Sequence, residues 1–189
     1  MQKNKINWEL VAPLIVTILL AISGYIYTHF ADLENEQNSA KIDRVNDQLR
    51  NLYGPLYSFA SVSEITWQEL ILLYPALTKI DSVNPKVPLT EVEQEEYRKY
   101  MLKVIQPLQL NAENAILNYS DLIDEKEMPT LFKELVAHIS DSKKLYSNWA
   151  NGDYSRHIPI NKYPADFRTY ITKEYNKLKS RQMELLGIQ

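Results

Sequence analysis

The chain has 189 residues, a formal net charge of −3, no cysteine and four glycines far apart in the sequence. This mild acidity disfavours nucleic-acid binding, which needs clustered Lys and Arg to neutralise phosphates. Widely spaced glycines exclude the Gly-rich loops that hold nucleotide phosphates, and a chain without cysteine has no thiolate to ligate a metal.

Residues 10–27 (LVAPLIVTILLAISGYIY) carry no charge. As a helix that rises about 1.5 Å per residue, this run nearly matches the hydrocarbon core of a bilayer, about 30 Å thick. It therefore predicts one membrane-spanning helix, and residues 1–30 form the tail and anchor. The expected anchor residues, with aromatic rings near the headgroups, are Trp8, Leu10, Leu14, Ile18, Ile22, Tyr25 and Tyr27.

A cleaved signal peptide is the alternative interpretation of this segment. Ala21 and Ser23 precede Gly24 in an arrangement that a signal peptidase accepts. The apolar run continues past this point and is longer than a signal h-region of about 7–15 residues. Its length favours a retained anchor.

The charges beside the span predict its orientation. Lys3 and Lys5 precede it, whereas Asp32, Glu34 and Glu36 come first on the other side. Because basic residues flank spans on the cytoplasmic side, we expect a single-pass protein of the cell membrane with a cytoplasmic N-terminus and the domain outside. A cytoplasmic domain is the alternative.

Residues 31–53 are predicted to form a helical stalk. Its apolar residues recur at steps of three and four, the a/d spacing of a coiled-coil seam. The seam residues are Ile42, Val45, Leu49 and Leu52. They either join two copies of the chain or pack against the rest of the domain.

Residues 54–189 are predicted to form a bundle of about four antiparallel helices, which makes the chain all-α. Gly54 and Pro55 punctuate the chain before the first of them, and residues 81–90 form the main loop. Thr90 and Glu93 have capping-box spacing, and the following apolar series keeps helical phase across Pro107. That phase predicts one long kinked helix. Pro129 and Pro164 open two further helices, and Gly152 and Gly187 end them.

No catalytic, metal or cofactor site is expected, and the chain is not predicted to be an enzyme. The three histidines, at positions 29, 138 and 157, lack the spacing that places two imidazoles on one metal. Neither the G-x-S-x-G nor the S-x-x-K nucleophile pattern occurs. His138 lies on an apolar stripe and is predicted to be a core histidine bonded to a carbonyl or a tyrosine.

One loop has the composition of a partner-binding surface. Aromatic residues and Arg are enriched where proteins bind one another. The candidate residues are Trp149, Tyr154, Arg156, His157 and Tyr163. The alternative is that they cover the end of the bundle.

Several helix boundaries carry a family resemblance. They are LYGPLY at 52–57, Met128-Pro129, residues 149–152, Tyr163-Pro164 and residues 178–186. In these features the chain resembles a loose group of bacterial and phage-borne proteins with one N-terminal span and a small helical domain. The group has no assigned activity, so the resemblance implies a fold and no mechanism.

These observations predict a membrane-anchored, non-enzymatic interaction module that docks to a protein partner or to a second copy. The alternative is an extracytoplasmic bundle that binds or senses a small molecule and acts through a partner. Thirteen tyrosines favour a semi-polar interior, because a buried Tyr needs a partner for its hydroxyl.

Overall fold

The computed structural model describes residues 8–75 and 89–188. All regular elements in these residues are helical, with no strand among them, so the expected all-α class is confirmed. The chain divides into two compact units, Met1–Asp43 and Arg44–Gln189, and the second is called the helical domain below. Most of the predicted loop at 81–90 lies outside the described residues.

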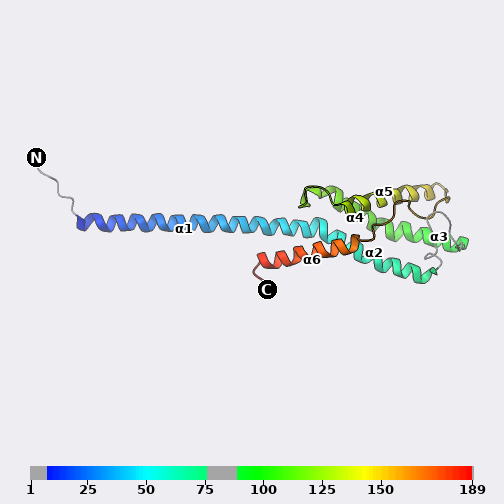
Figure 1. The fold of residues 1–189 in the computed structure, drawn as a ribbon, viewed down its shortest axis with the longest axis horizontal. Helices are drawn as coiled ribbons and strands as arrows, with labels where there is room; N and C mark the ends of the chain where they lie inside the picture. The colour runs from blue at the N-terminus through cyan, green and yellow to red at the C-terminus, as the bar shows by residue number, and fades with distance from the viewer. Residues whose placement is uncertain (1–7, 76–88, 189) are drawn as a thin grey trace, which may run out of the picture. The chain divides into compact units, whose positions relative to one another are not determined.

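The first unit contains most of α1 (Trp8–Asp47; Figure 1). Within the described part of the chain, the run that begins with α1 is the one helix long and apolar enough to cross a membrane, and none of its apolar window is buried. The hydroxyls of Thr17 and Ser23 donate to carbonyls four residues earlier, at 2.9 and 2.7 Å. These two hydroxyls are thus satisfied within the helix itself, which suits an apolar surrounding.

The described anchor side chains are exposed. They are Ile18, Ile22, Tyr25 and Tyr27. Trp8, Leu10 and Leu14 lie on α1, but their side chains are outside those described.

Gly54 and Pro55 do not interrupt the helix, in contrast to the expected punctuation. A π-helical segment, η1 (Gln48–Tyr53), joins α1 directly to α2 (Gly54–Leu73). The N–H of Gly54 donates to the carbonyl of Leu49, five residues earlier. A Cβ on Gly54 would collide with that carbonyl oxygen. The π turn therefore requires glycine here, and it places Pro55, which has no N–H, in the first turn of α2.

A second π segment precedes Pro107. α3 (Glu91–Tyr100), η3 (Met101–Ile105) and α4 (Gln106–Asn118) form one continuous run. The prediction of a single helical run across Pro107 is confirmed. The capping box is also confirmed, because the Thr90 N–H donates to Glu93 Oε2 at 2.8 Å and the Glu93 N–H donates to Thr90 Oγ1 at 3.3 Å.

The remaining elements are η4 (Ser120–Leu122), α5 (Thr130–Ala150) and α6 (Phe167–Leu185). Gly152 and Gly187 follow α5 and α6 with φ values of 78° and 67°. This left-handed conformation suits glycine and closes a helix. Both predicted helix ends are confirmed.

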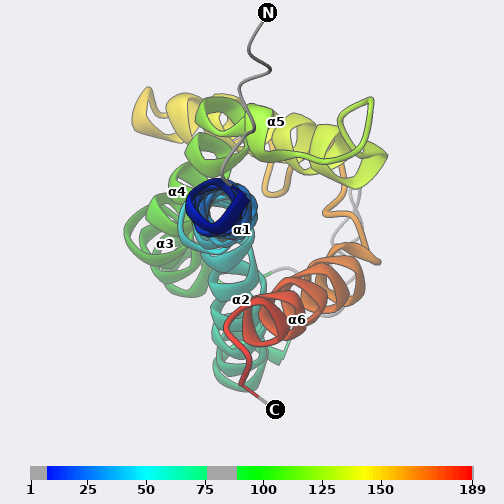
Figure 2. The same cartoon turned by 90° about the vertical axis from the view of Figure 1, so that its left-hand side faces the viewer.

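In the helical domain, α2, α4, α5 and α6 each lie beside two of the others (Figures 1 and 2). α2 packs against α4 and α6, α4 packs against α5, and α5 contacts α6. Two clusters of buried side chains form the core. The larger includes Leu52, Phe59, Phe132 and Phe167, and the smaller includes Leu70, Tyr97, Tyr146 and Trp149.

The predicted stalk seam lies partly inside this core. Val45 and Leu52 are buried in the larger cluster, and Leu49 packs against it. Ile42 is partly exposed and belongs to the first unit. These contacts favour internal packing of three seam residues, and self-association through the seam stays a prediction.

Replacing Gly54 by Ala should destabilise the domain. The new Cβ would force the Leu49 carbonyl to move, so we expect a loss of about 1–3 kcal/mol in the free energy of unfolding, measured by denaturant titration of the full chain in detergent. Gly24→Ala is the matched control, because nothing lies within 4 Å of a Cβ at that position and Ala is the better helix former. Equal stability of the two variants would contradict the prediction.

Candidate functional site

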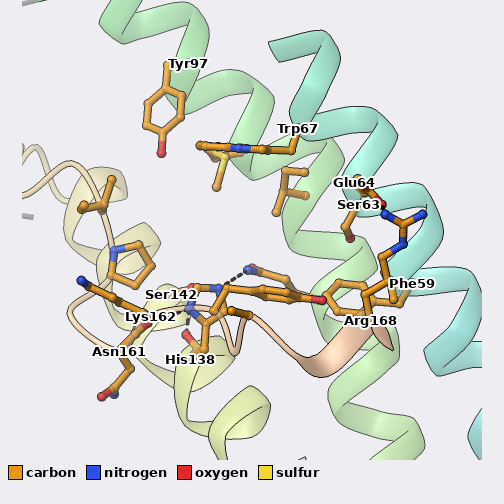
Figure 3. A pocket seen from close by; sticks show the side chains of 18 of the residues that line it. Phe59, Ser63, Glu64, Trp67, Tyr97, His138, Ser142, Asn161, Lys162 and Arg168 are labelled. Atoms are coloured by element: carbon orange, nitrogen blue, oxygen red, sulfur yellow. Dashed lines mark hydrogen bonds and ion pairs between the residues drawn. The ribbon is translucent and has the colours of Figure 1, made fainter. Parts of the chain in front are cut away.

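A cavity of about 620 Å³, partly open to solvent, lies between the helices of the helical domain (Figure 3). Its walls come from α2, α3, η3, α4, α5, α6 and the loop between α5 and α6, residues 151–166, called the α5–α6 loop below. Segments far apart in the sequence thus converge on one cavity.

Aromatic side chains form much of its wall. Phe59 and Trp67 come from α2, Tyr97 from α3 and Tyr163 from the α5–α6 loop. The Tyr163 ring lies edge-on to the imidazole of His138, with 5.7 Å between the centroids. Figure 3 shows Trp67 and Tyr97 across the cavity from His138. A flat apolar molecule would therefore meet ring surfaces on more than one side.

His138 contributes the imidazole of the cavity. Its Nδ1 lies 2.6 Å from the carbonyl oxygen of Asn161. A carbonyl only accepts, so Nδ1 carries the hydrogen and Nε2 is an acceptor in the neutral ring. Burial lowers the pKa of His138, against the opposing effects of the Asn161 hydrogen bond and the nearby Asp141 charge. The predicted hydrogen bond of His138 to a carbonyl is confirmed, whereas the residue is half-buried rather than in the core, and its ring lines the cavity.

A polar network continues from His138 into the wall. The Gln109 amide nitrogen lies 3.4 Å from His138 Nε2, and its oxygen accepts from the Tyr146 hydroxyl at 3.2 Å. The Ser142 hydroxyl donates to the backbone carbonyl of His138 at 2.9 Å. These groups fix one another in orientation, so the cavity has a defined polar side.

Asp141 attaches the α5–α6 loop to α5. Its carboxylate accepts from the Arg156 guanidinium at 3.2 Å, from the Asn161 N–H at 3.1 Å and from the Ile160 N–H. Burial acts to raise the pKa of Asp141, but these hydrogen bonds outweigh it and hold the pKa below its ordinary value. The anchored loop presents the Asn161 carbonyl to His138.

Three charged residues, Glu64, Lys162 and Arg168, line the cavity. Glu64 and Arg168 form an ion pair with each other. Lys162 is exposed, and in Figure 3 its amine points away from that pair. In the described part of the chain, no cluster of His, Asp and Glu is arranged to hold a metal ion.

The predicted partner-binding residues do not form one exposed surface. Trp149 is buried, and its indole N–H donates to the Arg156 carbonyl at 2.8 Å. Tyr154 is exposed, with the Arg98 guanidinium 4.2 Å from its ring centroid.

The other members of the predicted surface differ in exposure and in their contacts. Arg156 pairs with Asp141, and His157 is half-buried. Tyr163 is the one member of the five that lines the cavity.

Sequence reasoning did not single out Trp67, Tyr97 or Gln109 as site residues. All three lie on predicted helices, and a helical stripe looks the same whether it faces a filled core or a hollow one. No motif distinguishes the two cases.

Comparisons with protein-family models, with curated proteins and with solved structures find no match. The resemblance to small membrane-anchored bacterial and phage proteins stays a prediction. The function must therefore be argued from the cavity itself.

His138 should make the stability of the domain depend on pH. Its folded-state pKa is lowered, so the unfolded chain binds the proton first as pH falls below about 6.5. The stabilisation associated with neutral His138 is present above that pH, and it is lost as the pH falls toward the lowered pKa of His138 in the folded chain. We expect His138→Gln to weaken this dependence in denaturant titrations of the full chain between about pH 7.5 and 5.

The control for this prediction is His157→Gln, which should keep the pH dependence of the unmodified chain. His157 is half-buried in the α5–α6 loop and lies outside the cavity wall. The same reduction in both variants would contradict the assignment to His138.

Proposed function

We propose that this chain is a membrane-anchored domain that binds a small molecule in the cavity between its helices. The cavity is the observation that carries the proposal. Its volume of about 620 Å³ falls within the roughly 300–1,000 Å³ of small-molecule sites, which are apolar with a few fixed polar groups. Aromatic walls and the His138–Gln109 network match that description.

We propose binding rather than catalysis. The Ser142 hydroxyl donates to a backbone carbonyl and not to the imidazole of His138. His138 Nδ1 is committed to the Asn161 carbonyl, and its Nε2 lies within 3.4 Å of the Gln109 amide. A nucleophile activated by a base needs a hydrogen bond between the two, and these groups are used otherwise.

The proposed architecture is a transmembrane anchor at residues 1–30, a helical stalk from residue 31 and a bundle of about four antiparallel helices. We place the end of the stalk at Asp43 rather than at the predicted residue 53, because Val45 and Leu52 are buried in the core of the helical domain. The long apolar α1 supports the anchor. The position of Lys3 and Lys5 supports a cytoplasmic N-terminus with the bundle outside. An anchored domain is confined to the membrane surface, and this raises its effective concentration for partners in the same membrane.

Docking to a protein partner or to a second copy is the second candidate function. Apolar side chains spaced for one helical face are exposed on α2, including Ile65 at 59% and Leu72 at 80%. A ligand-binding domain with one span needs such a partner to pass on a signal, so the two functions are compatible.

Replacing Trp67 by Ala should weaken ligand binding. A broad set of metabolites tested by thermal shift on the full chain in detergent should include compounds that stabilise it, because ligands of the folded state raise its stability. Trp67 forms one wall and is 40% exposed, so the fold should tolerate its loss. We expect roughly tenfold weaker binding of such compounds.

Tyr154→Ala is the matched control, because Tyr154 is an aromatic residue outside the cavity wall. It should leave the affinity unchanged. A broad screen without any stabilising compound, or equal losses in both variants, would contradict the proposal.

Membrane topology should follow the lysine bias. The chain has no cysteine, so Asn151→Cys, at an exposed position after α5, gives a single thiol. We expect a membrane-impermeant maleimide to label this variant in intact cells. Labelling only after lysis would place the domain in the cytoplasm and contradict the proposed orientation.

A further inference from the structure

An open groove lies between η1 and α6, apart from the cavity that His138 lines. Its volume is about 550 Å³, and it is called the α6 groove below. η1 packs against α6, and residues from the last turn of α1 and the first turns of α2 complete the lining. All of these residues belong to the helical domain, and none of them lines the cavity. The α6 groove is therefore a separate feature of the same domain.

The lining of the α6 groove is positively charged. Arg50 on η1 and Lys179 on α6 both line it and are both exposed. No Asp or Glu is among its described lining residues. This composition contrasts with the chain as a whole, which has a net charge of −3. The groove thus offers two cations and no carboxylate to a bound molecule.

Neither cation is neutralised by a carboxylate in the described part of the chain. Arg50 makes no hydrogen bond or ion pair there. Lys179 Nζ donates to the neutral amide oxygen of Gln182 at 2.6 Å.

The two acidic residues of α6 are paired with other cations. Glu174 accepts from Lys177 at 3.2 Å, and Glu184 accepts from Arg181 at 2.7 Å. The positive charge of the α6 groove is therefore free to pair with an anion from outside the chain.

Neutral side chains hold the two sides of the α6 groove together. The Gln182 amide nitrogen donates to Asn46 Oδ1 at 2.6 Å, so hydrogen bonds run from Lys179 on α6 to the last turn of α1. The ring of Tyr175, which lines the groove, stacks on Tyr57 with 4.4 Å between the centroids and 5° between the planes. These contacts fix α6 against α1 and α2, so the groove exists before any molecule binds.

We propose that the α6 groove binds a phosphate monoester. Arg and Lys are the residues with which proteins bind phosphate, Arg through its planar fork and Lys as a point charge. A phosphate monoester carries about 1.5–2 negative charges at pH 7, which matches the two cations. The hydroxyls of Ser58 and Tyr175 add neutral donors to the lining. Either a soluble molecule or a lipid headgroup can carry such a phosphate.

Glycerol 3-phosphate is the probe, and its binding to the full chain in detergent is followed by phosphorus NMR. We expect saturable binding that becomes roughly tenfold weaker in Arg50→Gln and in Lys179→Gln, because each variant loses one charge-assisted contact. Both side chains are exposed, so the thermal midpoint of the probe-free chain should not change. Dimethyl phosphate, which carries a single charge, should also bind roughly tenfold more weakly than the monoester.

Lys177→Gln is the matched control. It removes the same charge from the same helix, but Lys177 is paired with Glu174 and does not line the α6 groove. It should keep the affinity of the unmodified chain. Equal losses in Lys177→Gln and Lys179→Gln, equal binding of dimethyl phosphate, or no saturable binding of glycerol 3-phosphate would each overturn the proposal.

The source of the phosphate is identified in nanodiscs of phosphatidylcholine, with and without added phosphatidic acid. Physiological ionic strength limits the reach of the surface charge to about 8 Å. If glycerol 3-phosphate binds only in the discs without phosphatidic acid, a lipid headgroup occupies the groove. If it binds equally in both, the ligand is a soluble phosphate monoester. None of these results bears on the proposed function, because the cavity and the α6 groove share no lining residue.

Discussion

The cavity depends on the attachment of the α5–α6 loop by the carboxylate of Asp141. One side chain accepts from the Arg156 guanidinium and from two backbone N–H groups, Ile160 and Asn161. Hydrogen bonds to a carboxylate are stronger than neutral ones, so a loop without secondary structure acquires a fixed position. The Asn161 carbonyl then sets the tautomer of His138, and the imidazole acceptor sets the orientation of the Gln109 amide. The orientation of the polar groups on this side of the cavity thus depends on the Asp141 carboxylate.

The cavity walls on α2 and α3, across from His138, depend on two π turns. Each precedes a proline that would otherwise break its helix, and each keeps the helical run continuous. The turn at Gly54 carries the chain from the buried residue Leu52 into α2, which bears Ser63 and Trp67. The turn before Pro107 joins α3, which bears Tyr97, to α4. Continuous helices hold side chains more rigidly than loops, so these walls are preformed.

Local features of the fold could be predicted from the sequence, whereas the cavity could not. The Thr90 capping box, the helix end at Gly152 and the single run across Pro107 follow from neighbouring residues alone, and all are confirmed. The continuity of the helix through Gly54 was not predicted, because a Gly-Pro pair is also typical of a helix break. In the structure the Gly54 N–H donates to the Leu49 carbonyl and the helix continues. The role of Trp149 was missed because its indole partner is a backbone carbonyl, which leaves no pattern in the side chains. A hollow between helices is a property of packing, and periodicity records only which face is apolar.

Under the proposed function, occupancy of the cavity and the stability of the folded chain are linked. Domains are stable by only about 5–15 kcal/mol, and a ligand that binds only the folded chain adds stability with the logarithm of its concentration relative to its dissociation constant. The cavity wall includes Trp67 on α2, Tyr97 on α3 and His138 on α5, so a bound ligand would stabilise the packing of three helices against one another. This is how a domain on a single membrane helix can present a different surface to a partner when its ligand is bound.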